Sequence, residues 1–268
     1  HNVLDLLDAR QIDAPKILVL HVSLSARASE EPNPPSPEEM SRQVQQYLSL
    51  IGGIAVAVSE SKRASWRLSC EVIRPAVDAG EWCGYHGADA RLLRVANQVN
   101  LRRARFAWDA HERVVEGLPF HLMGHNPDVP GSQPSQGWEH LRDAYRSHRA
   151  YVHTADPLLE DGYNLALLEA MATGMPVVST DAPGSPVVDG ENGFVGTDAA
   201  LLHEKASALL DDQDLAQRLG ARAREMVLDR FGMNAFTTGW RAALEHARDA
   251  FYATRGGAFR SAFSRESR

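Results

Sequence analysis

The chain has 268 residues, of which 44% are hydrophobic and 24% charged, and a formal net charge of −7. This composition is that of a globular protein with one large core or two modest ones, and the negative charge argues against nucleic-acid binding. The two cysteines, Cys70 and Cys83, form no metal-ligand pattern, and no apolar run is long enough to span a bilayer. We therefore expect a cytoplasmic location, which leaves open a peripheral position at the inner membrane face.

Short apolar runs alternate with helical patterns in the first part of the chain. Strands are predicted at residues 17–20, 54–58 and 70–73, and helices at residues 2–12, 38–50 and after Ser59. The proline-rich, acidic residues 28–39 predict an exposed loop. Because strands and helices of this length alternate, we expect a parallel sheet.

A second alternating series begins at Arg91. It predicts strands at residues 92–96, 120–123, 151–153 and 177–180, with helices at residues 107–116 and 138–148 and three more between residues 201 and 254. The loop between residues 181 and 196 carries the turn signals Asp189-Gly190 and Asn192-Gly193. The basic residues 255–268 predict a flexible tail.

The segment EDGYNLALLEAMATGMPVVSTD, at residues 160–181, has an unusual composition. It contains an acidic turn, a helix that is apolar on nearly every face, and a strand. Gly174 supplies the left-handed residue that ends a helix, and Pro176 prevents the helix from continuing. Because a helix that is apolar all round is buried, its one ionisable residue, Glu169, needs a partner.

A second carboxylate, Asp161, stands eight residues before Glu169 and just outside the predicted helix. Between them, the amides of Gly162, Tyr163 and Asn164 are expected to point out of the helix N-terminus, where anions bind. Amides flanked by carboxylates suggest a phosphorylated ligand that also carries hydroxyl groups. Taken singly, Asp161 could instead be an N-cap, and Glu169 a surface residue paired to an arginine.

This segment resembles the E-x7-E signature of retaining glycosyltransferases of the GT-B architecture, family 4-like (glycosyl transferases group 1), which typically reads E-G-F-G-x-x-x-x-E-A-M-A-x-G-x-P-V-V. Here Asp161 replaces the first glutamate and Asn164 a common glycine; asparagine tolerates unusual backbone angles. The resemblance implies that Asp161 contacts donor-sugar hydroxyls and Glu169 the nucleotide ribose. It also implies that the donor site includes Gly162, Tyr163, Asn164 and Leu165.

The first 80 residues resemble the acceptor-side domain of the same family. The run ILVLH resembles a family strand that ends in an active-site histidine, here His21, which by this resemblance faces the acceptor. Such a domain normally begins with further βα units, so either the chain is a fragment or its acceptor side is unusually small. We expect an α/β, GT-B-like fold with two Rossmann-like parallel-sheet domains: an incomplete one at residues 1–80 and a donor-binding one at residues 91–254.

The loop NQVNLRRARF, at residues 97–106, follows the first strand of the second domain. In the family this loop carries a basic pair, G-R-x-x-x-x-K-G, that binds the nucleotide diphosphate. Gln98 falls near the expected arginine, and Arg103 or Arg105 near the expected lysine. Cations are unfavourable at a helix N-terminus unless an anion compensates them. We therefore predict that Arg103 and Arg105 bind the diphosphate, in preference to Arg102.

The resemblance as a whole implies an enzyme that transfers a sugar from a nucleotide-sugar donor to an acceptor with retention of configuration. Amides and arginines can stabilise the leaving nucleoside diphosphate, so neither a metal nor another cofactor is expected. The sequence does not distinguish a saccharide, lipid or small-molecule acceptor, nor does it identify the donor nucleotide or the oligomeric state. Two alternatives stay open: a GT-B-fold nucleotide-sugar epimerase or sugar-phosphate-dependent synthase, and a non-catalytic nucleotide-sugar-binding module.

Two further patterns have simpler explanations. Asp212-Gln213-Asp214 matches a D-x-D metal motif, but its place between two helices favours an acidic N-cap. His121 and His125 flank a strand end rather than share a helix face, so zinc is not expected there. The sequence contains no Walker or G-x-S-x-G signature.

Overall fold

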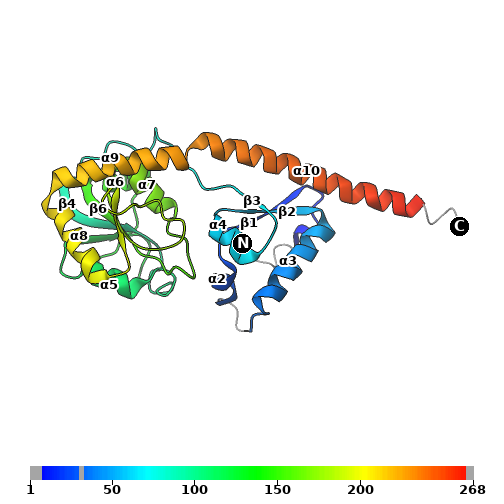
Figure 1. Ribbon diagram of the computed structural model, residues 1–268, viewed down its shortest axis with the longest axis horizontal. Helices are drawn as coiled ribbons and strands as arrows, with labels where there is room; N and C mark the ends of the chain where they lie inside the picture. Colours follow the sequence, from blue (N-terminus) through cyan, green and yellow to red (C-terminus); the bar gives the residue numbers. More distant parts are fainter. Residues whose placement is uncertain (1–7, 30–32, 264–268) are drawn as a thin grey trace. The chain divides into compact units, whose positions relative to one another are not determined.

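The computed structural model describes residues 8–29 and 33–263 (Figure 1). The chain divides into two compact units: the first comprises His1–Arg74 and Asn234–Arg268, and the second Pro75–Met233. Most of the helix predicted at residues 2–12 falls outside the described residues, as do residues 30–32 of the predicted acidic loop.

The first unit contains, in its described residues, a parallel sheet of three strands in the order β1-β2-β3. The strands are β1 (Lys16–Leu20), β2 (Gly53–Ala57) and β3 (Glu71–Val72), and the helices between them are α2 (Leu24–Ser29), α3 (Pro37–Ile51) and α4 (Glu60–Trp66). Serine side chains cap two of these helices: Ser36 accepts from the amide of Glu39, and Ser59 from that of Lys62. The predicted cap at Ser59 is confirmed, whereas α2 was not predicted.

The long helix α10 (Met233–Phe263) is grouped with the first unit except for its first residue. Its Ala243 is fully buried in a cluster with Val56 of β2 and Ile73. The observed division therefore falls at residue 233 rather than at the predicted boundary at residue 254, because the apolar side of α10 covers the first unit's strands. The helix continues to Phe263, into the predicted tail; residues 264–268 lie outside the described part.

The second unit contains a parallel sheet of five strands in the order β5-β4-β6-β7-β8, counted over the described residues. The strands are β4 (Asp89–Val95), β5 (Phe120–Met123), β6 (His148–His153), β7 (Val177–Thr180) and β8 (Gly193–Gly196). Every residue of the central strand β6 is buried, as expected for a strand covered on both faces. The four predicted strands of this region are confirmed, and β8 adds a fifth inside the predicted loop.

Helices cover both faces of this five-stranded sheet (Figure 1). Helices α5 (Trp108–Val115) and α8 (Ala199–Asp211) pack on one face, and α6 (Trp138–Ser147), α7 (Leu165–Thr173) and α9 (Gln213–Arg230) on the other. Successive strand residues point to opposite faces. Accordingly, Leu92 joins the core under α8, whereas Leu93 joins the core under α7. The predicted α/β fold with parallel sheets is confirmed.

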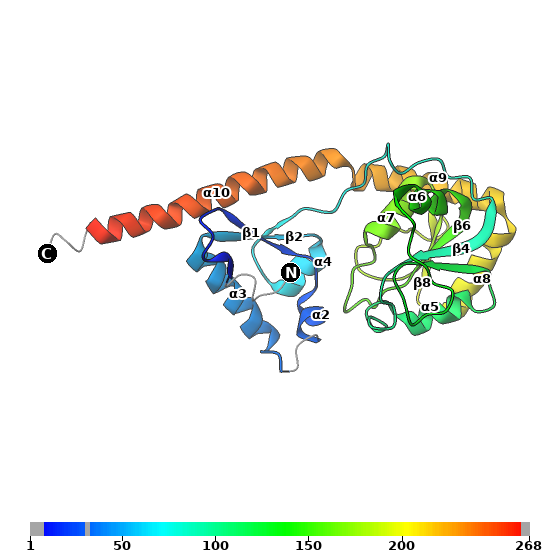
Figure 2. The same cartoon turned by 180° about the vertical axis from the view of Figure 1, so that it is seen from behind.

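The loops that follow the parallel strands meet at one edge of this sheet, its carboxyl edge (Figure 2). Thr154 Oγ1, after β6, donates to the carbonyl of Phe106 at 2.7 Å, and the amide of Ala155 donates to Thr180 Oγ1 at 2.9 Å. The loops after β4 and β5 approach so closely that a Cβ on Gly124 would lie 2.0 Å from the carbonyl oxygen of Ala96. These contacts gather residues from four strand ends into one surface.

Candidate active site at the carboxyl edge

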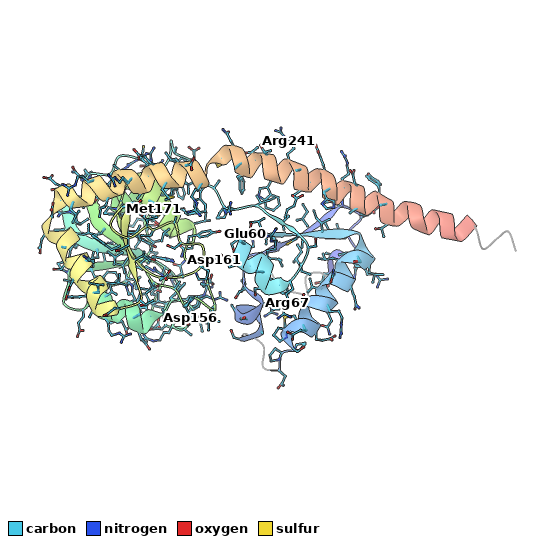
Figure 3. All side chains as sticks on the ribbon, in the orientation of Figure 1. Glu60, Arg67, Asp156, Asp161, Met171 and Arg241 are labelled. Atoms are coloured by element: carbon cyan, nitrogen blue, oxygen red, sulfur yellow. The ribbon has the colours of Figure 1, made fainter. Side chains whose placement is uncertain are left out.

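The segment at residues 160–181 has the predicted local structure. The side chain of Asn164 caps α7 by accepting a hydrogen bond from the amide of Leu167 at 2.9 Å. The helix ends at Gly174, whose φ of 102° is in the left-handed region. Its buried side chains, including Met171, pack inside the second unit (Figure 3). Because α7 follows β6 directly, its N-terminus lies at the carboxyl edge.

The N-terminus of α7 supplies fewer amides than predicted. The amides of Leu165 and Ala166 have no carbonyl to bond within the helix, and the side chain of Leu165 is 53% exposed. The amide of Gly162 instead donates to the carbonyl of Pro183 at 2.8 Å. The predicted free amide at Gly162 is therefore wrong, because this group ties the turn to the loop after β7. An anion at this point can therefore be bound by the amides in the first turn of α7, those of Leu165 and Ala166.

Gly162 and Tyr163 shape the turn through packing. A Cβ on Gly162 would lie 2.6 Å from the carbonyl oxygen of Ala182, so the close approach of the two loops requires glycine. The ring of Tyr163 is buried, with its centroid 5.1 Å from that of Phe231. These contacts fix the path of the chain between Asp161 and α7. Ligand contact by Gly162 or Tyr163 stays a prediction.

Asp161 is buried on this turn, with 3% of its surface exposed (Figure 3). The interpretation of Asp161 as an N-cap is wrong, because Asn164 performs that function. The φ of Asn164 is −144°, an extended conformation, so asparagine replaces the family's glycine here as a cap and not for its tolerance of unusual backbone angles. Contact between Asp161 and a donor sugar stays a prediction.

Glu169 lies on α7 with its carboxyl group directed at α6. Tyr145 Oη donates to Glu169 Oε2 at 3.1 Å, so the interpretation of Glu169 as a partner of an arginine is wrong. Burial raises the pKa of Glu169 to about 7, and the smaller effect of the Tyr145 hydrogen bond lowers it. Near neutral pH this carboxyl group is therefore close to the balance between its protonated and ionised forms, and in both forms it can accept hydrogen bonds from ribose hydroxyls. Its role toward a ribose stays a prediction.

Arg103 is held by carboxylates of the helix that follows it. Its guanidinium donates to Glu112 Oε2 at 2.7 Å and to Asp109, and also contacts Asn100 Oδ1 at 3.2 Å. The anions that compensate this cation at the start of α5 thus come from the protein itself. No bound diphosphate is therefore needed to compensate the charge of Arg103 at the helix N-terminus. Its role as a diphosphate ligand stays a prediction.

Arg105 lies beside the turn that carries Asp161. Its Nε is 3.1 Å from Glu160 Oε1, and both side chains are largely buried. Its carbonyl accepts a hydrogen bond from the amide of Asp156 at 3.0 Å. The structure therefore brings Arg105 and the 160–164 turn together, and the role of Arg105 toward a diphosphate stays a prediction. Arg102 is exposed, as is Gln98, whose φ is 55°.

His21 follows β1 directly, at the carboxyl end of the first unit's sheet, and its side chain is exposed. Partial burial lowers the pKa of His21, and the nearby charge of Lys62 lowers it further. A neutral imidazole at pH 7 can accept a proton or a hydrogen bond. The contribution of His21 to an acceptor site stays a prediction.

Two residues of this region were missed in the sequence. Tyr145 lies on an amphipathic helix and carries no sequence signal that links it to Glu169. Arg94 did carry a signal, because it interrupts the apolar run of β4, whose neighbours Leu92 and Leu93 are fully buried. Its guanidinium is also fully buried and donates to the carbonyls of Val152 and Thr154.

The other patterns have local explanations. Asp212 accepts from the amide of Leu215 at 2.8 Å, which confirms the predicted N-cap. His121 Nδ1 lies 3.0 Å from Nε2 of His148, a contact between histidines at the amino edge of the sheet. Within the described ranges, no three His, Cys, Asp or Glu side chains form a group that could hold a metal ion. None of the helices in those ranges is long and apolar enough to cross a membrane.

Residues 92–212 match the model of the family described as glycosyl transferases group 1. The match runs from β4 to the end of α8 and includes both carboxylates and both arginines of the candidate site. Residues 92–212 form a group 1 glycosyl transferase domain. The resemblance seen in the segment at residues 160–181 is thereby confirmed for the family, and the domain's sheet and helices supply the candidate site.

Curated relatives match parts of this group 1 domain. N-acetyl-alpha-D-glucosaminyl L-malate synthase of Bacillus anthracis is 39% identical over 77 residues, which are 27% of this chain and 20% of that protein. Trehalose synthase of Pyrococcus horikoshii is 33% identical over 94 residues, 34% of this chain and 23% of that protein. D-inositol 3-phosphate glycosyltransferase of Streptomyces griseus is 30% identical over 130 residues, 47% and 25% of the two chains. The aligned part of the chain spans about a quarter or less of these relatives.

Solved structures share the fold over a larger part of the chain. The Anabaena protein HepE, solved in complex with UDP and glucose, has a TM-score of 0.67 at 14% identity, covering 90% of this chain and 74% of that protein. TarM has a TM-score of 0.65 at 17% identity, covering 86% and 50% of the two chains. At such identities the similarity shows the fold alone, which is the mixed α/β architecture with parallel sheets of GT-B glycosyltransferases.

Proposed function

We propose that the chain is a glycosyltransferase that moves a sugar from a nucleotide-sugar donor to an acceptor, with retention of configuration and without a divalent metal. The observation that carries this proposal is the placement of the family's signature. The matched domain has Asp161 on the turn before α7 and Glu169 within α7, and the N-terminus of this helix lies at the carboxyl edge of a parallel sheet. Ligands of open α/β folds bind at that edge.

The residues of the candidate site meet the needs of the leaving group. When the bond between the anomeric carbon and the phosphate oxygen breaks, negative charge develops on the nucleoside diphosphate. The first-turn amides of α7 and the guanidinium of Arg105 can stabilise this charge without rearrangement. Asp161 would hold donor-sugar hydroxyls and Glu169 the ribose. Because HepE was solved with UDP, we propose a uridine nucleotide as the first donor type to test.

Nucleotide binding tests the donor site first. We expect one of UDP, GDP and ADP to raise the melting temperature of the full chain, and Glu169→Ala to abolish that increase because the ribose contact is lost. Glu225→Ala removes an exposed carboxylate on α9 and serves as the matched control. If none of the three nucleotides stabilises the wild-type chain, the proposed donor site is refuted.

Turnover separates a transferase from a binding module. The chain is incubated with radiolabelled UDP-, GDP- and ADP-sugars, and release or transfer of the sugar is measured with and without EDTA. We expect turnover that EDTA leaves unchanged and that Asp161→Asn reduces at least about tenfold, since the carboxylate is proposed to position the donor sugar. Nucleotide binding without any turnover would instead support the non-catalytic module, and loss of turnover in EDTA would contradict metal independence.

A further inference from the structure

Arg94 is a fully buried arginine beneath the candidate site. It is the last residue but one of β4, and it lies on the same face of the sheet as Leu92, toward α5 and α8. Its Nη1 lies 3.0 Å from the carbonyl oxygen of Val152 and 3.0 Å from His153 Nδ1, and its Nη2 lies 3.2 Å from the carbonyl oxygen of Thr154. Three acceptors at the end of β6 therefore hold the guanidinium in place.

These acceptors leave the charge of Arg94 without a counter-ion. The carbonyl oxygens are neutral, and because His153 Nδ1 accepts from the guanidinium, its imidazole is the neutral tautomer with the proton on Nε2. The aromatic ring of Phe106 lies 5.5 Å from the guanidinium carbon. Among the described residues no carboxylate pairs with Arg94, and its Nε has no hydrogen-bond partner. Charged side chains are rarely buried without an ionic partner, since removing a charge from water is costly.

The position of this charge connects it to both loops of the candidate site. Val152, His153 and Thr154 lead directly into the turn that carries Asp161. On the other side, Phe106 ends the loop that carries Arg105, and Thr154 Oγ1 donates to the Phe106 carbonyl at 2.7 Å. Arg94 thus lies where the loops after β4 and β6 meet.

Two of the arginines in the loop after β4 are already paired, whereas Arg102 on the same loop is exposed. Arg103 is bound by Glu112 and Asp109, and Arg105 by Glu160. The neutral Gln98 stands near the position at which the family's loop has an arginine. Arg94 therefore adds to this edge a buried positive charge that no carboxylate of the described residues neutralises.

We propose that Arg94 is a positioning residue of the donor site, whose buried charge attracts the diphosphate of the donor without touching it. This inference rests on the proposed function, because the ligand is the diphosphate of a nucleotide sugar. A charge fixed in a medium less polar than water acts over longer distances than a surface charge, because it is screened less. The hydrogen bonds of Arg94 also hold the end of β6, so a structural contribution must be separated from the electrostatic one.

Arg149 provides a matched control on β6, the strand next to β4 in the sheet. It lies at the opposite, amino end of β6, is also buried, and donates to the carbonyls of Gly87 and Leu210, each at 2.6 Å. Arg94→Met and Arg149→Met each remove, from a strand of the same sheet, a buried guanidinium that is held by backbone carbonyls. Both variants are expected to lower the melting temperature, but only Arg94→Met should change the preference for phosphorylated ligands.

The test compares ligands that differ in charge. Binding of UDP, GDP, ADP, the corresponding nucleosides and inorganic pyrophosphate to the full chain is measured by calorimetry. We expect Arg94→Met to lower the affinity for pyrophosphate, and for whichever nucleoside diphosphate binds the wild type, about tenfold. The affinity for the nucleoside that lacks the diphosphate should stay the same. Arg149→Met should leave both affinities within about twofold. If Arg94→Met does not fold, Arg94→Gln, which can still donate to a strand carbonyl, replaces it.

The outcomes separate this inference from the proposed function. If the Arg94 variant loses affinity equally for the nucleoside diphosphate and the nucleoside, Arg94 has a structural role and the inference is overturned. An unchanged affinity for the diphosphate also overturns it. In both cases the wild-type chain still binds a nucleotide, and the proposed function stands. A wild-type chain that binds none of the probes overturns both.

Discussion

Replacing Glu169 with glutamine tests the burial of this carboxyl group on α7. The amide oxygen of Gln can still accept the hydrogen bond from Tyr145, so the change removes the titration and keeps the contact. Because burial raises the pKa of Glu169 from 4.5 to about 7, the folded chain binds a proton between these pH values that the unfolded chain does not. The stabilising effect of this proton is fully present below pH 4.5 and is lost as the pH rises through 7.

The size of the effect follows from the pKa difference. At about 1.4 kcal/mol per pKa unit, the shift of Glu169 from 4.5 to about 7 corresponds to roughly 3 kcal/mol in the free energy of unfolding. The partial exposure of the carboxyl group reduces this contribution to about 2 kcal/mol. We therefore expect Glu169→Gln and the wild type to have similar free energies of unfolding near pH 4.5. At pH 8 we expect the variant to be more stable by about 2 kcal/mol.

Urea unfolding of both proteins between pH 4.5 and 8.5 measures this difference. The wild type should lose stability relative to Glu169→Gln across the interval centred near pH 6, and the difference should become constant above pH 8. Glu225→Gln, on the exposed side of α9, should follow the wild type at every pH. A difference between Glu169→Gln and the wild type that does not change with pH would refute the raised pKa and with it the buried environment of Glu169.

Substitutions at three further positions probe the same region. Tyr145→Phe removes the hydrogen bond that lowers the pKa of Glu169, so the loss of stability in the same urea series should move to higher pH; an unchanged midpoint would contradict the contact. Asn164→Ala removes the cap of α7 and should cost about 1 kcal/mol in thermal unfolding, whereas Asn164→Asp should be nearly neutral. Gly162→Ala places a methyl group against the Ala182 carbonyl and should lower stability by about 1–3 kcal/mol; a melting temperature equal to that of the wild type would show that the two loops separate easily.

Much of the second unit could be predicted from local sequence patterns. The strands at residues 120–123 and 177–180 were predicted with their observed bounds, and Gly174 ends α7 as predicted. These features depend on interactions between residues close in sequence and on the burial of apolar runs in a parallel sheet. The strand β8 was missed because its four residues, GFVG, lie among turn-forming residues and are stabilised by pairing with β7.

The candidate site also combines features that the local sequence encodes with features that only the folded structure sets. The sequence by itself determined the carboxylates Asp161 and Glu169, the turn between them and the family to which the matched domain belongs, because these depend on spacing along one short segment. The tertiary structure decided which polar groups are already occupied: the Gly162 amide by Pro183, Arg103 by carboxylates of α5, and Glu169 by Tyr145. It also decided that Arg94 is buried. Those partners come from elements that are distant in the chain or turned toward each other by folding, and no local pattern encodes such contacts.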